Sequence, residues 1–301
     1  MKEKILIAIG GPTASGKSKV AMELARHFHS EIINADSRQV YKEMNIGVNK
    51  PSEEELKTIH HYLIGHKSVF KEYNAGRYEQ DALAAIMHTF ATHDIAILIG
   101  GTGLYINAVL NGIDIFPDIS REIKDKVSKL FESGGLEALQ NKLLETDPEY
   151  AAVVDFKNPR RIARALEIVF TSGLPYSSFK QNQIKSRDFK TITIFIDKDR
   201  KSLYNIIDER VDQMIQQGLK EEAKALFPHR YLKALQTVGY SEWFDHFEGK
   251  ISEIETIEKI KQHTRNYAKR QWTWWRPLHW PSFESNQLTQ ILNYINLKIS
   301  E

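Results

Sequence analysis

One stretch near the start of the chain has the residue types and the spacing of a phosphate-binding loop. Residues 11–18 read GPTASGKS and match the pattern G-x-x-x-x-G-K-S/T at every fixed position. In such a loop successive backbone N–H groups face an anion, and the helix that follows adds its partial positive charge. The lysine reaches the terminal phosphate oxygens, and the last hydroxyl can take a Mg²⁺ site. We expect a diphosphate or triphosphate to be held by Gly11, Pro12, Thr13, Ala14, Ser15, Gly16, Lys17 and Ser18.

A carboxylate that can serve the same site is Asp36. Most ATPases with this loop hold their metal through an aspartate at the end of an apolar strand, but the apolar run 95–99 ends in Gly-Gly-Thr. Asp36 instead follows the apolar run 31–34. Ligands of open α/β sheets lie beyond the carboxyl ends of the strands. We therefore expect Asp36 to face the phosphates as a reacting group, with a turn or helix-capping aspartate as the alternative.

Arg210 lies on a helical face that is otherwise apolar. In the expected helix 200–217, the neighbours of Arg210 on that face include Leu203, Ile207 and Val211. A buried guanidinium without an anionic partner costs several kcal/mol, so Arg210 must meet an anion. The anion is either an interior carboxylate or a bound phosphate, since arginine forms paired bonds to phosphate oxygens.

Short apolar runs that alternate with helical patterns indicate the elements that position these residues. The predicted strands are 4–9, 31–34, 95–99 and 191–197. The predicted helices around them are 16–29, 78–92, 200–217 and 254–276. This alternation predicts a parallel sheet with right-handed crossovers. From about residue 120 to 172 only helical patterns occur, and 180–190 reads as a linker. We expect a discontinuous α/β core, residues 1–118 and 190–301, that carries an inserted all-helical domain, residues 119–189.

The composition narrows the function classes. The 301 residues carry a net charge of +2 and are 42% hydrophobic, so the chain is no polycation, and any nucleic-acid binding must come from a local basic patch. Without cysteine there is no disulfide framework, thiolate zinc site or cysteine nucleophile. No apolar run is long enough to cross a bilayer. We expect a cytoplasmic enzyme with no membrane partner and no obligate protein partner.

Two local regions are basic despite the nearly neutral total. Arg160, Arg161 and Arg164 gather on one side of a predicted helix in the insert. Residues 259–276 contain six Lys or Arg, no acid, and interleaved aromatic residues. Basic helices with aromatic side chains suit backbone phosphates and splayed bases. The alternative is a solvated helix face with core tryptophans.

Several longer motifs accompany the phosphate loop. They are ADSRQVYKEMNIG at 35–47, LIGGTGLY at 98–105, NPRRIARALEI at 158–168, TVGYSE at 237–242 and AKRQWTWWR at 268–276. With these motifs the chain resembles the tRNA isopentenyltransferase family, also called tRNA dimethylallyltransferases, in its bacterial type and over essentially its whole length. One departure is Val48-Asn49 in NIGVNKP, where the family usually has Gly-Thr-x-Lys-Pro. Position 48 therefore lacks the family's hydroxyl, which bears on a direct contact from that position and not on the chemistry.

The resemblance implies a P-loop NTPase-like core and a reaction. The reaction is transfer of a dimethylallyl group from dimethylallyl diphosphate to N6 of the adenosine 3′-adjacent to the anticodon, with Mg²⁺ as cofactor. Asp36 resembles the general base. Lys17, Ser18 and Arg210 resemble ligands of the diphosphate and the metal, with Asp36 as a second candidate metal ligand, and Thr102 resembles a residue of the reaction channel.

The resemblance also implies contacts to the anticodon stem-loop of tRNA, and it implies that the inserted domain, residues 119–189, binds tRNA. The matching positions are Asp36, Ser37, Arg38, Gln39, Thr102, Lys124, Arg160, Arg161, Arg164, Gln236, Gly239, Tyr240, Lys269, Arg270 and Arg276. Three alternatives stay open at this point. One is a phosphate-loop kinase that phosphorylates a small metabolite, another is an enzyme that prenylates free adenine nucleotides, and the third is a non-enzymatic RNA-binding module.

Overall fold

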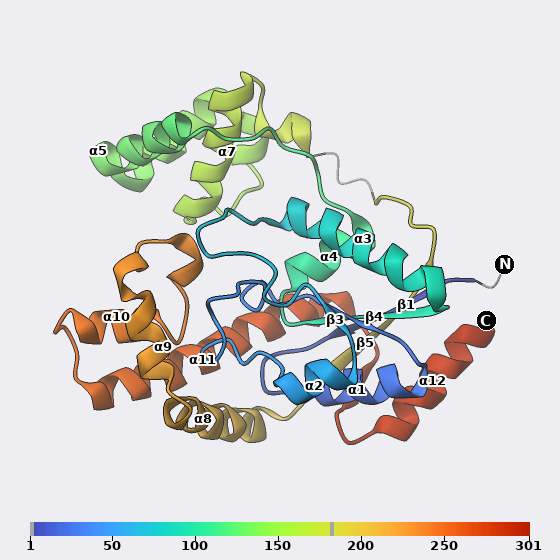
Figure 1. Cartoon of the computed structure of the whole chain (residues 1–301). Helices are drawn as coiled ribbons and strands as arrows, with labels where there is room; N and C mark the ends of the chain where they lie inside the picture. Colours follow the sequence, from blue (N-terminus) through green and yellow to red (C-terminus); the bar gives the residue numbers. More distant parts are fainter. Residues whose placement is uncertain (1–2, 181–183) are drawn as a thin grey trace. The chain divides into compact units, whose positions relative to one another are not determined.

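The computed structural model describes residues 3–180 and 184–301, and its centre is a six-stranded parallel sheet (Figure 1). The strands are β1 Ile5–Gly10, β2 Ile32–Asn34, β3 His61–Tyr62, β4 Ile95–Gly100, β5 Lys190–Asp197 and β6 Ser282–Glu284. They lie in the order β3-β2-β4-β1-β5-β6, and every neighbouring pair is parallel. The strand before the phosphate loop is therefore central, with β4 and β5 on its two sides.

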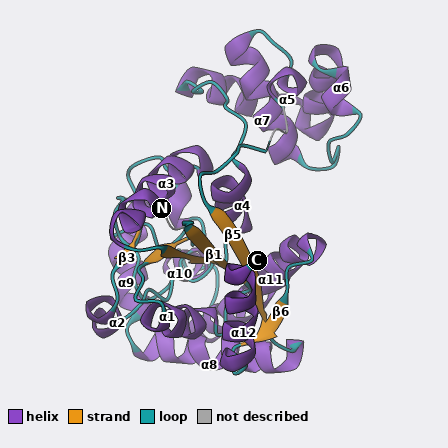
Figure 2. Ribbon diagram, turned by 90° about the vertical axis from the view of Figure 1, so that its right-hand side faces the viewer, coloured by secondary structure: helices purple, strands orange, loops and turns teal. Residues whose placement is uncertain are grey.

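Helices cover both faces of this sheet (Figure 2). Those of the core are α1 Lys17–His27, α2 Glu53–Thr58, α3 Ala75–Thr92, α4 Gly103–Asn111, α8 Arg200–Gln216, α9 Leu219–Leu226, α10 Ser241–Phe247, α11 Glu253–Trp275 and α12 Leu288–Ser300. The sheet and these helices confirm the predicted α/β class. Across residues 3–180 and 184–301, no helix combines the length and the apolar character needed to cross a membrane.

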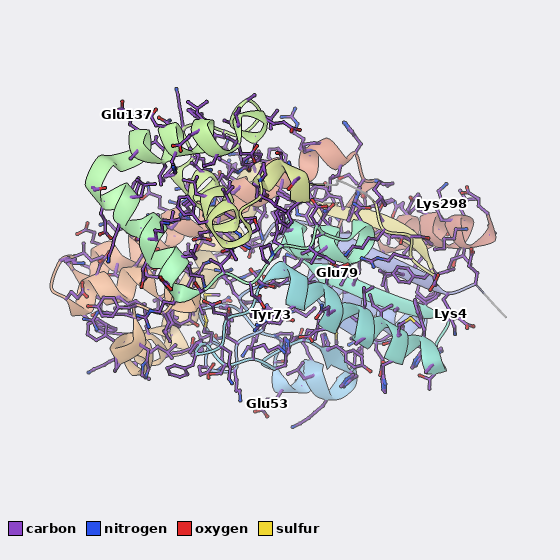
Figure 3. All side chains as sticks on the ribbon, turned by 90° about the horizontal axis from the view of Figure 1, so that it is seen from above. Lys4, Glu53, Tyr73, Glu79, Glu137 and Lys298 are labelled. Carbon is purple, nitrogen blue, oxygen red and sulfur yellow. The ribbon has the colours of Figure 1, made fainter. Side chains whose placement is uncertain are left out.

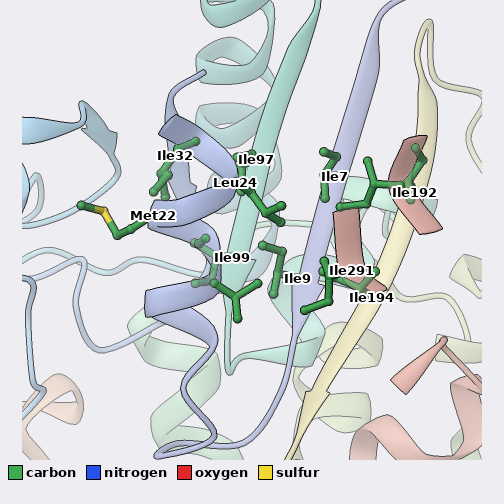
Figure 4. Packing of buried hydrophobic residues seen from close by; sticks show 14 of the residues in the cluster. Ile7, Ile9, Met22, Leu24, Ile32, Ile97, Ile99, Ile192, Ile194 and Ile291 are labelled. Atoms are coloured by element: carbon green, nitrogen blue, oxygen red, sulfur yellow. The ribbon is translucent and has the colours of Figure 1, made fainter. Parts of the chain in front are cut away.

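The period of two along β1 divides the core into two layers. Ile5, Ile7 and Ile9 point to the side of α1 and α12, whereas Leu6 and Ala8 point to the side of α3 and α4. Figure 4 shows Ile7 and Ile9 within the first of these layers. All six residues of β1 are buried, as expected for a central strand of a parallel sheet. Both faces therefore hold β1 in place, and this fixes the position of the loop that follows it.

A second compact unit, residues 112–185, interrupts the core in sequence. It contains α5 Arg121–Thr146, α6 Pro148–Ala151 and α7 Pro159–Ser172 around its own apolar cluster. The helical backbone of α5 is interrupted at Gly135. Asn158 caps α7, since its side chain accepts a hydrogen bond from the backbone N–H of Arg161. The predicted insert, 119–189, overlaps this unit, and its role as a tRNA-binding domain stays a prediction.

The core is tied together where the chain returns from the insert. The Arg187 side chain donates hydrogen bonds to the backbone oxygens of Ala108 (2.9 Å) and Val109 (2.8 Å), near the end of α4. It also pairs with the buried carboxylate of Glu79 at 2.8 Å. Glu79 lies on α3 and is labelled in Figure 3. One side chain thereby joins the returning segment to α3 and α4.

Most predicted elements occur close to their expected bounds, but several elements were not predicted. The edge strands β3 and β6, with two and three residues, are too short to show a period. The expected linker 180–190 includes residues 181–183, which lie outside the described part of the chain.

Candidate active site

A cavity of about 310 Å³ opens where the chain leaves β1, β2 and β4. The phosphate loop, the segment after β2, the glycines after β4 and one face of α8 contribute to its wall. Predicted site residues among its lining are Thr13, Ala14, Gly16, Lys17, Ser18, Asp36, Arg38, Gln39, Gly239 and Arg210. Met22, Ile207 and Met214 add apolar surface. The cavity thus combines cationic, acidic and apolar groups.

Three cations, Lys17, Arg38 and Arg210, converge on this cavity. Arg210 donates a hydrogen bond to the hydroxyl of Thr13 at 3.2 Å, and in the part of the chain that the structure describes no carboxylate lies within 4 Å of its guanidinium. Burial, and then the nearby charge of Arg38, lower the pKa of Arg210. The interior carboxylate considered as its alternative partner is therefore not found among the described residues.

Lys17, like Arg210, is buried close to other cations. Its ammonium donates a hydrogen bond to the backbone oxygen of Pro12 at 2.9 Å. Burial lowers the pKa of Lys17 to about 8; Asp36 acts in the opposite direction, while Arg210 and Arg38 lower it further. The charges of the three cations together exceed that of Asp36, so the cavity is suited to a multiply charged anion.

The position of Asp36 is set by the strand before it and by the turn after β4. The backbone N–H of Ala35 donates to the oxygen of Ile99 at 2.6 Å, and the N–H of Thr102 donates to the oxygen of Ala35 at 3.2 Å. A Cβ at Gly100 would overlap the backbone of Ala35, so only glycine permits this approach. The carboxylate of Asp36 accepts a hydrogen bond from the N–H of Arg38 at 2.9 Å. Asp36 thus occupies a turn and also lines the cavity.

Thr102 contacts the turn that carries Asp36. Its hydroxyl accepts a hydrogen bond from the N–H of Ser37 at 3.0 Å and donates one to the Ser37 hydroxyl at 3.2 Å. Burial raises the pKa of Tyr267, and the nearby charge of Arg38 acts in the opposite direction. The guanidinium of Arg38 stacks over the Tyr267 ring at 4.5 Å, and its Nε is buried with no hydrogen-bond partner among the described residues. The Tyr267 ring therefore packs against Arg38, close to the turn that carries Asp36.

Two polar side chains of the site were missed by sequence reasoning. The buried amide of Gln271 contacts both the phosphate loop and the turn after β4. Glu222 accepts hydrogen bonds, each of 3.0 Å, from the backbone N–H groups of Asn45, Ile46 and Gly47. Gln271 lies with Ala268 and Trp275 on the buried side of α11. A polar residue within an apolar stripe, the signal that singled out Arg210, could have found it.

The other residues predicted to contact tRNA differ in how exposed their side chains are. Lys269, Arg270 and Arg276 are exposed, whereas Tyr240 is fully buried and its hydroxyl donates to Glu222 at 2.6 Å. The side chain of Gln236 hydrogen-bonds the backbone oxygen of Arg230. The second unit contains Lys124 and three exposed arginines, Arg160, Arg161 and Arg164.

The departure at positions 48 and 49 has a packing explanation. The Val48 side chain is buried in an apolar cluster with Met44 and Tyr240. The Gln39 amide donates to the backbone oxygens of Val48 (3.2 Å) and Asn49 (2.8 Å). The contact with Gln39 therefore needs the backbone at these positions and no side-chain hydroxyl.

Comparison with known proteins decides the family. A family model described as IPP transferase matches residues 39–277. A tRNA dimethylallyltransferase from Christiangramia forsetii is 44% identical over 298 residues, which cover 98% of each chain. The chain belongs to the IPP transferase family. A tRNA dimethylallyltransferase from Flavobacterium johnsoniae is 43% identical and covers 99% of each chain.

Solved structures agree with this membership. The structure of a tRNA isopentenylpyrophosphate transferase from Bacillus halodurans has a TM-score of 0.72 and 33% identity, and the match covers 99% of this chain and 97% of that one. A eukaryotic dimethylallyltransferase acting on tRNA has a TM-score of 0.75 and 29% identity, with 90% and 70% covered. The predicted resemblance, the P-loop NTPase-like fold and the prenyltransferase class are confirmed, and the kinase alternative is not favoured.

Proposed function

We propose that this enzyme transfers a dimethylallyl group from dimethylallyl diphosphate to N6 of the adenosine 3′-adjacent to the anticodon of tRNA. The observation that supports this most strongly is the cavity in which Lys17, Arg38 and Arg210 lie near the carboxylate of Asp36. Such a site can stabilise a departing diphosphate while it removes a proton from an amine. The family supplies the substrate class.

The cationic residues fit the leaving group. When the bond between C1 and the bridging oxygen breaks, its electron pair goes to the diphosphate, and negative charge develops on that oxygen. In this proposal Lys17, Arg210 and N–H groups of the phosphate loop stabilise this charge. Apolar lining residues such as Met22 and Met214 suit the dimethylallyl chain.

Asp36 fits the acceptor. The adenine amino group is a weak nucleophile because its lone pair is delocalised into the ring. As its nitrogen forms the new bond to C1, it must lose a proton, and a carboxylate nearby can accept it. The base must leave the anticodon stack to reach the cavity, and the Thr102 side of the turn is the proposed contact.

Mg²⁺ is the proposed cofactor, and the residues present fit it. In proteins this ion is held by few protein oxygens together with phosphate oxygens and water. Ser18 and Asp36 both line the cavity, and no group of three or more metal-ligating side chains is found within the described ranges. When bound, the ion would neutralise charge on the diphosphate.

The tRNA is proposed to contact the exposed basic residues of α7 and of the end of α11. Arg160, Arg161 and Arg164 lie on α7, and Lys269 and Arg270 on α11. Backbone phosphates are the expected partners, because exposed lysine and arginine give affinity without reading the sequence.

Incubation of the enzyme with unmodified tRNA, dimethylallyl diphosphate radiolabelled in the isoprenoid, and Mg²⁺ tests the proposal. Nucleoside analysis should recover the label as N6-isopentenyladenosine from the position next to the anticodon. A parallel reaction with AMP in place of tRNA serves as the control for free nucleotides. Label on AMP and none on tRNA would overturn the proposed acceptor.

A further inference from the structure

A buried amide joins the two halves of the proposed reaction site. Gln271 lies on α11 and is 6% exposed. Its Oε1 accepts a hydrogen bond from the backbone N–H of Thr13 at 2.8 Å, and its Nε2 donates to the backbone oxygen of Gly101 at 3.0 Å. Both ends of the amide are thus satisfied by backbone groups of two different loops.

Each of these loops carries one part of the chemistry. Thr13 belongs to the phosphate loop, and its hydroxyl also holds Arg210. Gly101 precedes Thr102, whose hydroxyl is bonded to Ser37 beside Asp36. The Gln271 side chain therefore adds a hydrogen-bonded link between the diphosphate cradle and the turn that contacts the proposed base.

The fit around the amide is close. A Cβ at Gly101 would collide with Nε2 of Gln271, so the glycine leaves room for this side chain. Loss of the amide would leave the Thr13 N–H and the Gly101 oxygen without these partners, which is costly in a buried setting. The contact is therefore specific to an amide of this length.

We infer that Gln271 is a positioning residue that sets the distance between the diphosphate cradle and Asp36. This inference rests on the proposed function of the same site. As the bond from C1 to oxygen breaks, the allylic carbon becomes electron-poor and reacts with the nucleophile nearest to it. With the amine in place, nitrogen bonds to C1, Asp36 takes the proton, and diphosphate leaves with the electron pair.

A misplaced amine changes the product. If water is nearer, its oxygen bonds to C1, the water proton is lost to solvent, and dimethylallyl alcohol and diphosphate are released. The ratio of prenyl groups on tRNA to diphosphate released therefore reports the alignment of the two halves. A merely structural loss lowers the amount of active enzyme and leaves this ratio unchanged.

The test compares Gln271→Met, which keeps the length and loses both hydrogen bonds, with Gln287→Met. Gln287 is a matched control because its Oε1 also accepts a backbone N–H, that of Glu284, at 2.8 Å outside the cavity. For Gln271→Met we expect the prenyl-to-diphosphate ratio to fall at least about twofold. We expect kcat for tRNA prenylation to fall about tenfold to a hundredfold, the effect of a small misplacement. The KM for dimethylallyl diphosphate should stay within about threefold, since Lys17 and Arg210 remain.

Amide hydrogen exchange provides a readout that does not need catalysis. In Gln271→Met, exchange should become faster in peptides covering 11–16 and 99–105 together, and in Gln287→Met in neither. Gln271→Glu keeps the acceptor for the Thr13 N–H and loses only the donor to the Gly101 oxygen. Exchange should therefore become faster in 99–105 more than in 11–16. This variant is used for the test if the methionine variant does not fold.

A wild-type ratio together with unchanged exchange in Gln271→Met would overturn the inference, and so would an equal fall in ratio in Gln287→Met. If the wild-type enzyme puts no label on tRNA, the proposed function fails, and the exchange measurement still decides whether Gln271 joins the two loops.

Discussion

Replacing Asp36 by asparagine tests its role as a base while it keeps the local hydrogen bonding. Its carboxylate oxygen accepts the N–H of Arg38, and an asparagine can preserve that bond while it loses the basic oxygen. We expect Asp36→Asn to lower the turnover of tRNA prenylation at least about a hundredfold, the range of a lost general base, with tRNA binding largely kept. Single-turnover assays and filter binding measure the two effects.

Asp199→Asn is the matched control for this substitution. Asp199 caps α8 by accepting the N–H of Ser202 at 2.9 Å, so the same chemical change is made in a similar local setting outside the proposed machinery. It should leave turnover unchanged. Near-normal turnover in Asp36→Asn would reject the base assignment.

The lowered pKa of Lys17 predicts that anion binding depends on pH. Burial lowers its pKa to about 8 from 10.5, so above pH 8 the free enzyme holds Lys17 mostly neutral. A bound diphosphate raises this pKa, because an opposite charge favours the ammonium. Binding should therefore take up protons near and above pH 8 and weaken as the pH rises through this range. Titration calorimetry with inorganic diphosphate, in buffers of different ionisation enthalpy, measures the uptake.

Lys17→Arg is the control for the titration of the diphosphate itself, because arginine stays charged throughout this range. The variant should show less proton uptake at pH 8 than the wild type. Equal uptake in both proteins would show that Lys17 does not titrate on binding.

At the scale of elements, α9 holds a loop of the cavity wall through one carboxylate. Glu222 accepts three backbone N–H groups and the Tyr240 hydroxyl. Glu222→Ala leaves these donors without their acceptor and should lower the free energy of unfolding by about 2–3 kcal/mol. Glu221→Ala, an exposed neighbour on the same helix, should change it by less than about 0.5 kcal/mol. Urea unfolding compares them; equal effects would contradict the role of Glu222.

The helix α7 gives a prediction about RNA. Arg161 is exposed near its start, where backbone phosphates are the proposed partners. Arg161→Ala should weaken tRNA binding and reduce the salt slope by about one, while the affinity for diphosphate is kept. Lys142→Ala removes a cation that Glu145 already pairs at 2.8 Å in the same unit, and should have little effect. An unchanged affinity and slope in Arg161→Ala would remove α7 from the proposed tRNA surface.

The elements also show what the sequence can and cannot predict. The central strands were predicted because both faces of β1 are buried, which gives a continuous apolar run. The sequence could not show whether Arg210 meets a carboxylate or a phosphate, because the answer depends on which distant residues face α8. The same limit applies to Gln271, whose partners lie 258 and 170 residues away. In contrast, α12 could have been predicted, because Leu288, Ile291 and Ile295 lie at helical spacing in the sequence.

At the scale of the whole molecule, the core supplies the cavity and the insert supplies further basic surface. The phosphate loop is shared by enzymes that break a phosphorus–oxygen bond, and its presence in this chain does not by itself specify which bond breaks. The central claim is that here the loop, with Lys17 and Arg210, stabilises a diphosphate leaving from carbon. Asp36 then accepts the proton that the adenine amino group loses.

The most direct test follows the bridging oxygen of dimethylallyl diphosphate. The donor is labelled with ¹⁸O between C1 and phosphorus, and tRNA-dependent turnover is followed by mass spectrometry of the released diphosphate. Carbon–oxygen cleavage leaves the label in the diphosphate, which is the result we predict. Recovery of the ¹⁸O with the isoprenoid fragment would mean that the phosphorus–oxygen bond breaks, and would contradict prenyl transfer at this site.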